Sequence, residues 1–285
     1  MLSKIEKIEL LEKSTAMRKL CLEMIAVPGS SHVGGAMSII DLLTVLYSKV
    51  LRVRPTEPKW AARDRLILSK GHAGPALYSA LALEGYFPME QAYTLNQPDT
   101  LLPSHCDMTK TIGIDMTAGS LGQGLSAGIG MAIAARLDKL DYNVYVIVGD
   151  GEQQEGQVWE AAMYAGHQKL ENLMVFIDNN KMQIDDETAN ICAVDSIADK
   201  WAAFNFNVFA CDGHDHSAIL DAIQKAQAVK NGKPSAIVMD TVKGKGAVHC
   251  EGQVTSHSTT VTKDELAACI ADLDDRLARA ISCVE

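Results

Sequence analysis

The sequence of 285 residues lacks both an excess of positive charge and any long apolar segment. Its 26 lysines and arginines are outnumbered by 36 aspartates and glutamates, which gives a formal net charge of −10. This surplus of negative charge argues against nucleic acids and anionic membranes as general partners. No apolar run approaches the roughly 20 residues that a helix needs to cross a bilayer. We therefore expect neither nucleic-acid binding nor a membrane-embedded segment.

Paired cysteines are lacking as well. The seven cysteines are scattered without a Cys-x-x-Cys pair, which is typical of reduced thiols rather than of a disulfide framework or a zinc site. Residues 1–13 mix lysine and glutamate in an amphipathic pattern, so they do not look like a secretory signal peptide. No internal repeat or linker is visible. The sequence therefore predicts a cytoplasmic protein with a single domain over residues 1–285.

Apolar stretches of strand length alternate with stretches of helical periodicity. The apolar runs predict strands at residues 65–68, 143–148, 173–177, 206–210 and 235–239. The helical pattern predicts helices at residues 5–26, 35–50, 74–83, 121–140, 157–169, 196–204, 215–229 and 263–281. Residues 97–115 and 182–195 are expected to be long loops. Strands separated by helices predict an α/β fold, with a doubly wound, mostly parallel sheet and helices on both of its faces.

One strand–helix–strand unit carries the most informative residues. Gly149, Asp150 and Gly151 follow the strand at 143–148, and Asn180 follows the next strand along the chain. In an open parallel sheet, ligands bind at the carboxyl ends of the strands, so these residues are expected at one binding edge. Carboxylate and amide oxygens suit Mg²⁺, and glycines let backbone N–H groups approach a diphosphate. The pattern indicates a site for a metal-bound diphosphate.

Three histidines stand in loops beside predicted elements. His32 lies in a glycine-rich helix entry, His72 between a strand and a helix, and His105 in the first long loop. A single loop histidine is more often a surface or capping residue, but three of them near a diphosphate site favour a functional interpretation. Neutral imidazole exchanges protons near pH 7, which suits hydroxyl-rich substrates. His167 and His214 are expected to be structural.

The strings GDGEQQEGQVWEA and FIDNNKMQID together resemble the thiamine diphosphate motif, and the first is similar to that of transketolases in particular. Four more strings resemble successive transketolase motifs in the family's order: SHVGGAMSIIDLL, LSKGHAGPALYSAL, TAGSLGQGLSAGIGMA and DTVKGKG. The resemblance covers essentially the whole chain. It implies the diphosphate-binding (PP-type) domain of the thiamine-diphosphate-binding fold, with thiamine diphosphate and Mg²⁺ (or Ca²⁺ or Mn²⁺) as cofactors.

The resemblance, together with the glycine pattern, also assigns roles to individual residues. It makes Asp150 and Asn180 side-chain ligands of the metal, and Met182 a ligand through its backbone carbonyl. The residues expected against the cofactor are His72, Gly119, Ser120, Leu121, Gly149, Gly151, Asn180, Lys243 and His257. The implied catalytic set is His32, His72, His105, Glu155 and His257, of which His32 and His105 would contact the sugar. Lys243 and Lys245 are open to two interpretations, an anchor for the diphosphate or a loop, or a solvated strand end.

The chain departs from the family pattern beside two of these histidines. Ser104-His105-Cys106 stands where the family usually has Gly-His-Pro, a change that could alter which sugar head group fits. Ser258 follows His257 where the family commonly has glycine. Cys106 beside His105 raises the alternative of a nucleophilic thiol, although thioester chemistry would compete with the thiamine interpretation.

Transketolases also need a carboxylate from a second domain, which acts on the pyrimidine ring of the cofactor. This chain ends at Glu285, where that domain would begin, so the resemblance implies the diphosphate-binding subunit of a split transketolase. A separate C-terminal subunit would carry the pyrimidine domain and the catalytic glutamate, in a heterotetramer with two copies of each chain. Glu155 would couple to that glutamate and Glu160 would lie near the interface, unless Glu155 serves only the start of a helix.

The implied reaction is the transfer of a two-carbon ketol unit from a ketose or its phosphate to an aldose or its phosphate. Two alternatives stay open, the thiamine-binding α-subunit of a 2-oxoacid dehydrogenase and a non-catalytic cofactor-binding subunit. The histidines and Trp159-Glu160-Ala161 favour the transketolase, because 2-oxoacids lack the hydroxyls that the histidines would bind. The sequence leaves the sugar open, between the pentose phosphate pathway and a route for a branched or sulfonated sugar.

Overall fold

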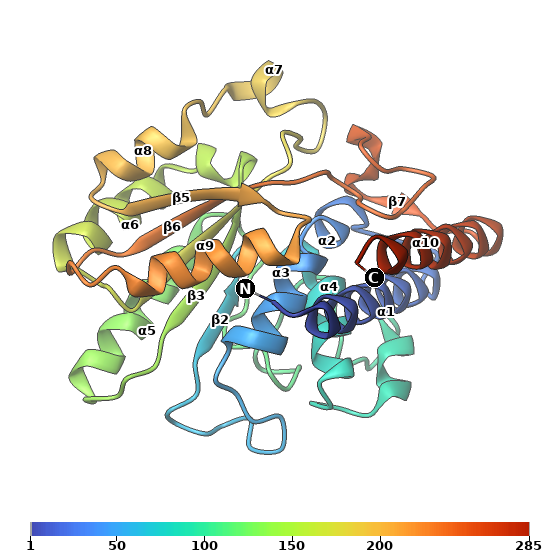
Figure 1. The fold of residues 1–285 in the computed structure, drawn as a ribbon, viewed down its shortest axis with the longest axis horizontal. Helices are drawn as coiled ribbons and strands as arrows, with labels where there is room; N and C mark the ends of the chain where they lie inside the picture. The colour runs from blue at the N-terminus through green and yellow to red at the C-terminus, as the bar shows by residue number, and fades with distance from the viewer. Residues whose placement is uncertain (1, 285) are drawn as a thin grey trace.

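The computed structural model of the protein describes residues 2–284. At its centre lies a parallel sheet of five strands in the order β2-β3-β4-β6-β5 (Figure 1). The strands are β2 (Arg65–Leu68), β3 (Val144–Gly149), β4 (Leu173–Asn179), β5 (Asn207–Asp212) and β6 (Ser235–Asp240). The central strands β3 and β4 are apolar along most of their length because both of their faces are buried. The predicted α/β fold with a parallel, doubly wound sheet is confirmed.

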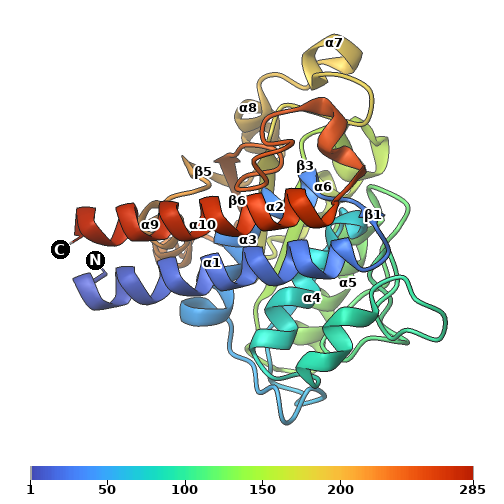
Figure 2. The ribbon, with the colours of Figure 1, turned by 90° about the vertical axis from the view of Figure 1, so that its right-hand side faces the viewer.

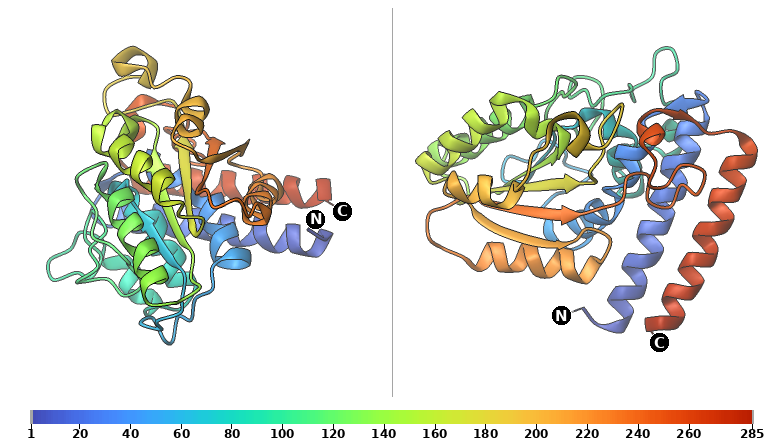
Figure 3. Two further views of the ribbon diagram at one scale, coloured as in Figure 1. Left: turned by 90° about the vertical axis from the view of Figure 1, so that its left-hand side faces the viewer. Right: turned by 90° about the horizontal axis from the view of Figure 1, so that it is seen from above.

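Helices cover both faces of this sheet (Figure 1, Figure 3). Along β4, Met174 and Phe176 belong to one buried cluster, while Val175 and Ile177 belong to the other. The first cluster also contains side chains of α1 (Lys4–Ala26), α2 (Gly34–Met37), α3 (Ile40–Val45), α4 (Gly74–Leu83) and α9 (His216–Ala228). The second contains side chains of α5 (Gln123–Leu137), α6 (Gly156–Gln168) and α8 (Ile197–Ala203). Successive residues of a strand point to opposite faces, so each central strand joins both helical layers.

The two ends of the described chain lie side by side. The last helix, α10 (Lys263–Val284), runs antiparallel to α1 (Figure 2). A two-stranded antiparallel sheet of β1 (Ser30–Ser31) and β7 (Thr259–Thr260) joins the same two parts of the chain. This pairing brings the segment of His32 next to that of His257, two residues that are far apart in the sequence.

One predicted helix is wrong in detail. The helix expected at residues 35–50 is interrupted between α2 and α3, where Ile39 has a non-helical backbone, and it ends in a π-helical turn, η1 (Leu46–Val50). The interruption accompanies a contact of the buried Ser38, whose hydroxyl donates to Asp178 at 2.7 Å. That partner lies 140 residues away, so the local pattern carries no sign of it.

The segments that connect the strands and the longer helices contain a short helix and 3-10 turns. The loop expected at residues 182–195 contains a short helix, α7 (Thr188–Cys192), whereas residues 97–115 are irregular as expected. The 3-10 turns are η2 (Gly71–Ala73), η3 (Met89–Thr94), η4 (Gly151–Gln154) and η5 (Val254–His257). Across residues 2–284, no helix combines the length and the apolar character that crossing a membrane requires.

Candidate functional site at the carboxyl edge of the sheet

A cavity of about 420 Å³ opens where β2, β3, β4 and β6 end. Every residue that the sequence predicts for the site lines this cavity, with the exception of Ser120, which is exposed. Side chains as far apart in the sequence as His32 and His257 therefore meet at the edge where parallel sheets bind ligands. The roles of these residues stay predictions, while their convergence is a property of the fold.

The carboxylate of Asp150, just after β3, is one of the buried charged groups that line this cavity. The residue is 2% exposed, and its two oxygens accept from the backbone N–H groups of Gly151 at 2.8 Å and Lys181 at 2.5 Å. No lysine or arginine among residues 2–284 forms an ion pair with it. Burial, and then the neighbouring Asp178, raise the pKa of Asp150 to about 6. A buried carboxylate without an ion-pair partner is costly, so a bound divalent ion fits this position.

Asn180 is oriented by a buried ion pair whose lysine lines the cavity. Lys70 Nζ lies 2.5 Å from Asp178 Oδ2, and the same oxygen accepts from the amide nitrogen of Asn180 at 2.9 Å. The amide oxygen of Asn180 accepts from the N–H of Met182 at 3.1 Å. Burial would raise the pKa of Asp178, but Lys70 and the hydroxyl donors outweigh it and hold that pKa below its usual range. The ion pair thus fixes the orientation of the Asn180 amide, with its nitrogen toward Asp178 and its oxygen toward the N–H of Met182.

The donor set differs from a cluster of acidic or sulfur ligands. No group of three or more histidine, cysteine, aspartate or glutamate side chains that could hold a metal occurs in the described part of the chain. The predicted ligands are instead one carboxylate, one amide and one backbone carbonyl. Three oxygen donors of this kind leave the other coordination positions of an octahedral Mg²⁺ for water and phosphate oxygens. Mg²⁺ is usually bound in this way.

Four histidines gather on one wall of the cavity. The ring centroid of His32 lies 5.3 Å from those of His72, His105 and His257, and the rings of His72 and His257 are 5.0 Å apart. Burial, and then Lys70, hold the pKa of His72 well below its usual range. Burial, and then Lys243, lower the pKa of His257 to about 4, and burial also lowers the pKa of His32. These three rings are therefore neutral near pH 7.

The histidine wall contains an unpaired nitrogen and depends on one glycine. Nδ1 of His32 is buried and has no hydrogen-bond partner within residues 2–284, which is unusual for a buried polar atom. A Cβ at Gly35 would lie 2.9 Å from His72 Nε2, closer than real Cβ contacts allow. Only a glycine at this position lets the His72 ring pack where it does.

Glu152, which the sequence pattern did not single out, joins three segments of the site. It is 2% exposed, and its oxygens accept from the N–H groups of Gly122 at 2.8 Å and Gly149 at 2.9 Å. The Ser69 hydroxyl donates to the same carboxylate. One side chain thus fixes the end of β3, the entry to α5 and the turn after β2. The N–H of Gly149 already donates to Glu152. We therefore expect Gly149 to let a diphosphate approach the backbone closely, and not to donate a hydrogen bond to it.

The two lysines of the DTVKGKG string have different positions. Lys243 is buried in the cavity wall, where its Nζ donates to the backbone carbonyl of Gln183 at 2.7 Å. Burial, and then Lys70, lower the pKa of Lys243 to about 8. Lys245 lies outside the cavity and forms an ion pair with Glu251 at 3.3 Å. The anchoring interpretation is therefore retained for Lys243, which holds the residue after Met182.

The remaining predicted residues lie at the rim. Gly119 and Leu121 line the cavity beside the start of α5. Glu155 also lines it, is exposed and stands at the N-cap position of α6, where its side chain makes no capping hydrogen bond. Glu160 and His167 are exposed on α6, outside the cavity.

Cys106 does not have the surroundings of a nucleophile. It is 1% exposed and absent from the cavity lining, although it follows His105 directly. Burial raises the pKa of its thiol to about 12. A reactive cysteine needs an accessible thiolate, so the structure disfavours the thiol alternative.

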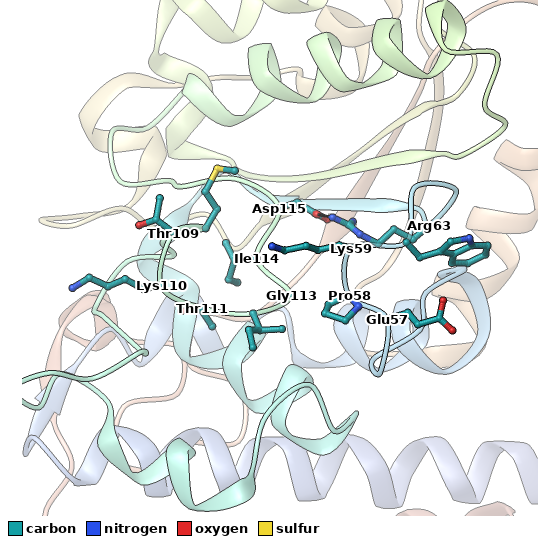
Figure 4. A pocket seen from close by; sticks show the side chains of 13 residues that line it. Glu57, Pro58, Lys59, Arg63, Thr109, Lys110, Thr111, Gly113, Ile114 and Asp115 are labelled. Carbon is teal, nitrogen blue, oxygen red and sulfur yellow. Dashed lines mark ion pairs between the residues drawn. The ribbon is translucent and has the colours of Figure 1, made fainter.

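A larger hollow, of about 700 Å³, lies at the other end of β2 (Figure 4). Its wall includes Arg63 and Asp115, whose side chains form an ion pair at 2.5 Å. Asp115 also accepts from the N–H of Leu66, the second residue of β2, at 2.8 Å. None of the residues predicted for the site lines this hollow. Its volume therefore does not make it the better candidate.

Known proteins match the chain along most of its length. Residues 11–274 match the family model for the thiamine diphosphate binding domain of transketolase. A 6-deoxy-6-sulfo-D-fructose transketolase subunit of Clostridium sp. (strain MSTE9) is 50% identical over 269 residues, covering 94% of this chain and 98% of the relative. An apulose-4-phosphate transketolase subunit of Phocaeicola vulgatus is 36% identical over 273 residues, covering 96% of each chain.

Solved structures with this fold are transketolases as well. That of Campylobacter jejuni has a TM-score of 0.88 and 30% identity over 93% of this chain. That of Pichia stipitis in complex with sedoheptulose-7-phosphate has a TM-score of 0.86 and 29% identity over 97% of this chain. This chain spans 43% and 45% of those two chains, whereas it spans nearly all of the relatives named as subunits. The chain belongs to the transketolase family and corresponds to its thiamine diphosphate binding domain.

Proposed function

We propose that this chain is the diphosphate-binding subunit of a two-subunit transketolase, and that residues 1–285 form one thiamine-diphosphate-binding domain. The observation that carries the proposal is the meeting of a buried carboxylate without an ion-pair partner among residues 2–284 with four clustered histidines at one sheet edge. The carboxylate suits a metal-bound diphosphate, and the histidines suit a substrate with several hydroxyls. The relatives that are named as transketolase subunits support the same assignment.

The proposed metal ligands are the side chains of Asp150 and Asn180 and the backbone carbonyl of Met182, with Mg²⁺ as the ion and Ca²⁺ or Mn²⁺ as substitutes. The diphosphate would lie against Gly149 and Gly151, whose backbone permits close approach. Contacts to the cofactor are further proposed for His72, Gly119, Ser120, Leu121, Lys243 and His257. The buried carboxylate of Asp150, which has no ion-pair partner among residues 2–284, and the unpaired Nδ1 of His32 support a ligand of this kind.

Thiamine diphosphate, when bound, supplies the electron sink that lets the bond beside a ketose carbonyl break. The chain itself orients the reactants. We propose that His32 and His105 hold hydroxyl groups of the sugar, and that His72 and His257 hold the diphosphate and the reacting end of the substrate. A neutral imidazole donates from one nitrogen and accepts at the other, so His32, His72 and His257 can each pair with a hydroxyl in either sense. Burial keeps them neutral.

A second chain is proposed to complete the site. It would carry the pyrimidine domain with the catalytic glutamate, and two copies of each chain would form a cytoplasmic heterotetramer. Glu155 supports this arrangement, because its carboxylate stands exposed at the rim of the cavity. We propose that Glu155 meets the catalytic glutamate of the second chain and that Glu160 lies near the interface.

The donor is proposed to be a ketose that ends in an anionic group. One relative is named for 6-deoxy-6-sulfo-D-fructose at 50% identity, and another for apulose 4-phosphate at 36%. No arginine of residues 2–284 lines the cavity, which supports binding of the sulfonate or phosphate by the second chain. The higher identity makes 6-deoxy-6-sulfofructose the first donor to try.

The test is a comparison of donors with both chains, thiamine diphosphate and Mg²⁺ present. 6-Deoxy-6-sulfofructose, fructose 6-phosphate and pyruvate would each be offered with an aldose phosphate, and the products identified by mass spectrometry. We expect a two-carbon ketol unit to appear on the aldose with a ketose donor, and no turnover of pyruvate. Decarboxylation of pyruvate without ketol transfer would assign the 2-oxoacid dehydrogenase alternative. Cofactor binding without turnover of any donor would assign the non-catalytic one.

A further inference from the structure

Four ionisable side chains meet in the core outside the cavity. Arg18 of α1 binds both carboxylate oxygens of Asp41 in α3, one of them at 3.0 Å. His214, in the turn between β5 and α9, places Nδ1 2.8 Å from Asp41 Oδ2, and His216 places Nε2 3.0 Å from Oδ1. Burial would raise the pKa of Asp41, but Arg18 and the two histidines outweigh it and hold that pKa well below its usual range. Asp41 is therefore a fixed buried anion.

The contacts of His214 determine which of its ring nitrogens carries the proton. Nε2 accepts from the backbone N–H of Val242 at 2.8 Å. A backbone N–H only donates, so Nε2 is unprotonated, and the proton must be on Nδ1, which donates to Asp41. The carboxylate thus selects the tautomer that can hold Val242, in the way that a second partner orients a metal-binding histidine.

Val242 begins the loop that carries Lys243 into the cavity. The same loop is fastened by Arg18, whose Nε donates to the carbonyl of Lys245 at 3.3 Å. It is also fastened by the N–H of Gly244, which donates to the carbonyl of Gly34 at 2.9 Å. A continuous series of contacts therefore leads from Asp41, on the far side of the loop, to the Lys243 side chain in the site.

We propose that His214 is a positioning residue: as the Nδ1–H tautomer selected by Asp41, it holds the loop at residues 242–246 so that Lys243 reaches the cofactor cavity. The inference rests on the proposed function, in which Lys243 contacts the diphosphate.

The first arm of the experiment needs no cofactor. Nitrogen-15 spectra of the histidine-labelled chain, with His214→Gln used to assign the signal, report which ring nitrogen is protonated. We expect an unprotonated Nε2 at neutral pH. Hydrogen exchange of the peptide at residues 240–247 should be faster in His214→Phe than in the wild type. A protonated Nε2 with an unprotonated Nδ1, or unchanged exchange, would overturn the proposal even if His214→Phe fails to accumulate, because the spectrum uses the wild-type chain.

The second arm measures thiamine diphosphate affinity with Mg²⁺ in the complex with the second chain. His214→Phe should bind about fivefold to tenfold more weakly, the effect of losing one backbone hydrogen bond. His214→Gln keeps an acceptor near Nε2 and should restore affinity to within about twofold. The matched control is His167→Gln, an exposed histidine on α6. Wild-type affinity in His214→Phe contradicts the proposal, whereas absence of cofactor binding by the wild type contradicts the proposed function instead.

Discussion

At the scale of single residues, the charge of Asp150 is the feature on which the metal site depends. Replacing it by asparagine keeps its shape and removes a buried negative charge that forms no ion pair with a lysine or arginine of residues 2–284. We expect Asp150→Asn to weaken Mg²⁺-dependent binding of thiamine diphosphate by more than about 100-fold, as measured by calorimetry. Asp138→Asn, an exposed change at the end of α5, is the control. Unchanged affinity in Asp150→Asn would remove the metal assignment.

Glu152 offers a second test at this scale. In Glu152→Gln an amide NH₂ replaces one acceptor oxygen and faces a backbone N–H, so one buried donor loses its partner. Such a loss costs about 1–3 kcal/mol, and we expect a lower urea midpoint together with weaker cofactor binding. The exposed Glu160→Gln should change neither stability nor cofactor affinity of the isolated chain. Equal midpoints for the two variants would show that the carboxylate does not join the three segments.

The sequence predicts the residues that face the ligand better than those that hold them in place. Asp150 and Asn180 follow apolar strands directly, so their place at the sheet edge follows from the local pattern. Lys70, Asp178 and Glu152 act through partners that are distant in the chain, 108 residues apart for the ion pair and 83 for Ser69 with Glu152. No local periodicity reports such pairs. A charged residue inside an otherwise buried motif is the only sequence signal they leave.

At the scale of elements, α5 contains a matched pair of glycines. A Cβ at Gly128 would lie 2.6 Å from Val146 of β3, whereas a Cβ at Gly130 meets nothing within 4 Å. We expect Gly128→Ala to destabilise the chain by about 1–3 kcal/mol through overpacking. Gly130→Ala should stabilise it by up to about 1 kcal/mol, because alanine favours a helix. Urea unfolding of both variants checks the packing of α5 on the sheet, and equal shifts of the same sign would contradict it.

Element boundaries follow from the sequence where packing agrees with the local pattern. The strands and the helices α1 and α4 lie close to their expected ranges, because their apolar periodicity matches the faces that the sheet buries. The interruption at Ser38 and Ile39 and the small β1–β7 sheet depend on partners from other parts of the chain. The β1–β7 pairing also brings His32 to His257. The deviations from the expected elements therefore lie beside the site.

At the scale of the whole molecule, the histidine wall makes stability depend on pH. The pKa of His257 is lowered to about 4 in the folded chain, below the ordinary value near 6.5 that applies to the unfolded chain. Above that ordinary value both states are neutral, and below it the unfolded state takes up a proton first. The free energy of unfolding therefore falls as the pH drops from about 6.5 toward 4, by at most about 1.4 kcal/mol per pH unit for each such histidine.

Unfolding of the chain at a series of pH values checks this dependence. We expect His257→Gln to flatten the curve between about pH 6.5 and 4, since glutamine takes up no proton. The exposed His167→Gln should leave the curve as it is in the wild type. Parallel curves for His257→Gln and the wild type would show that the His257 ring is not held neutral by burial.

The central claim concerns the whole assembly: this chain holds the metal and the diphosphate, and a second chain supplies the rest of the site. The most direct measurement is the rate of ketol transfer while a fixed amount of this chain is titrated with the chain that carries the pyrimidine domain, at saturating thiamine diphosphate and Mg²⁺. The account predicts no transfer by either chain alone and a rate that rises to a plateau at equal amounts of the two. Transfer by this chain alone as fast as by the mixture would contradict it.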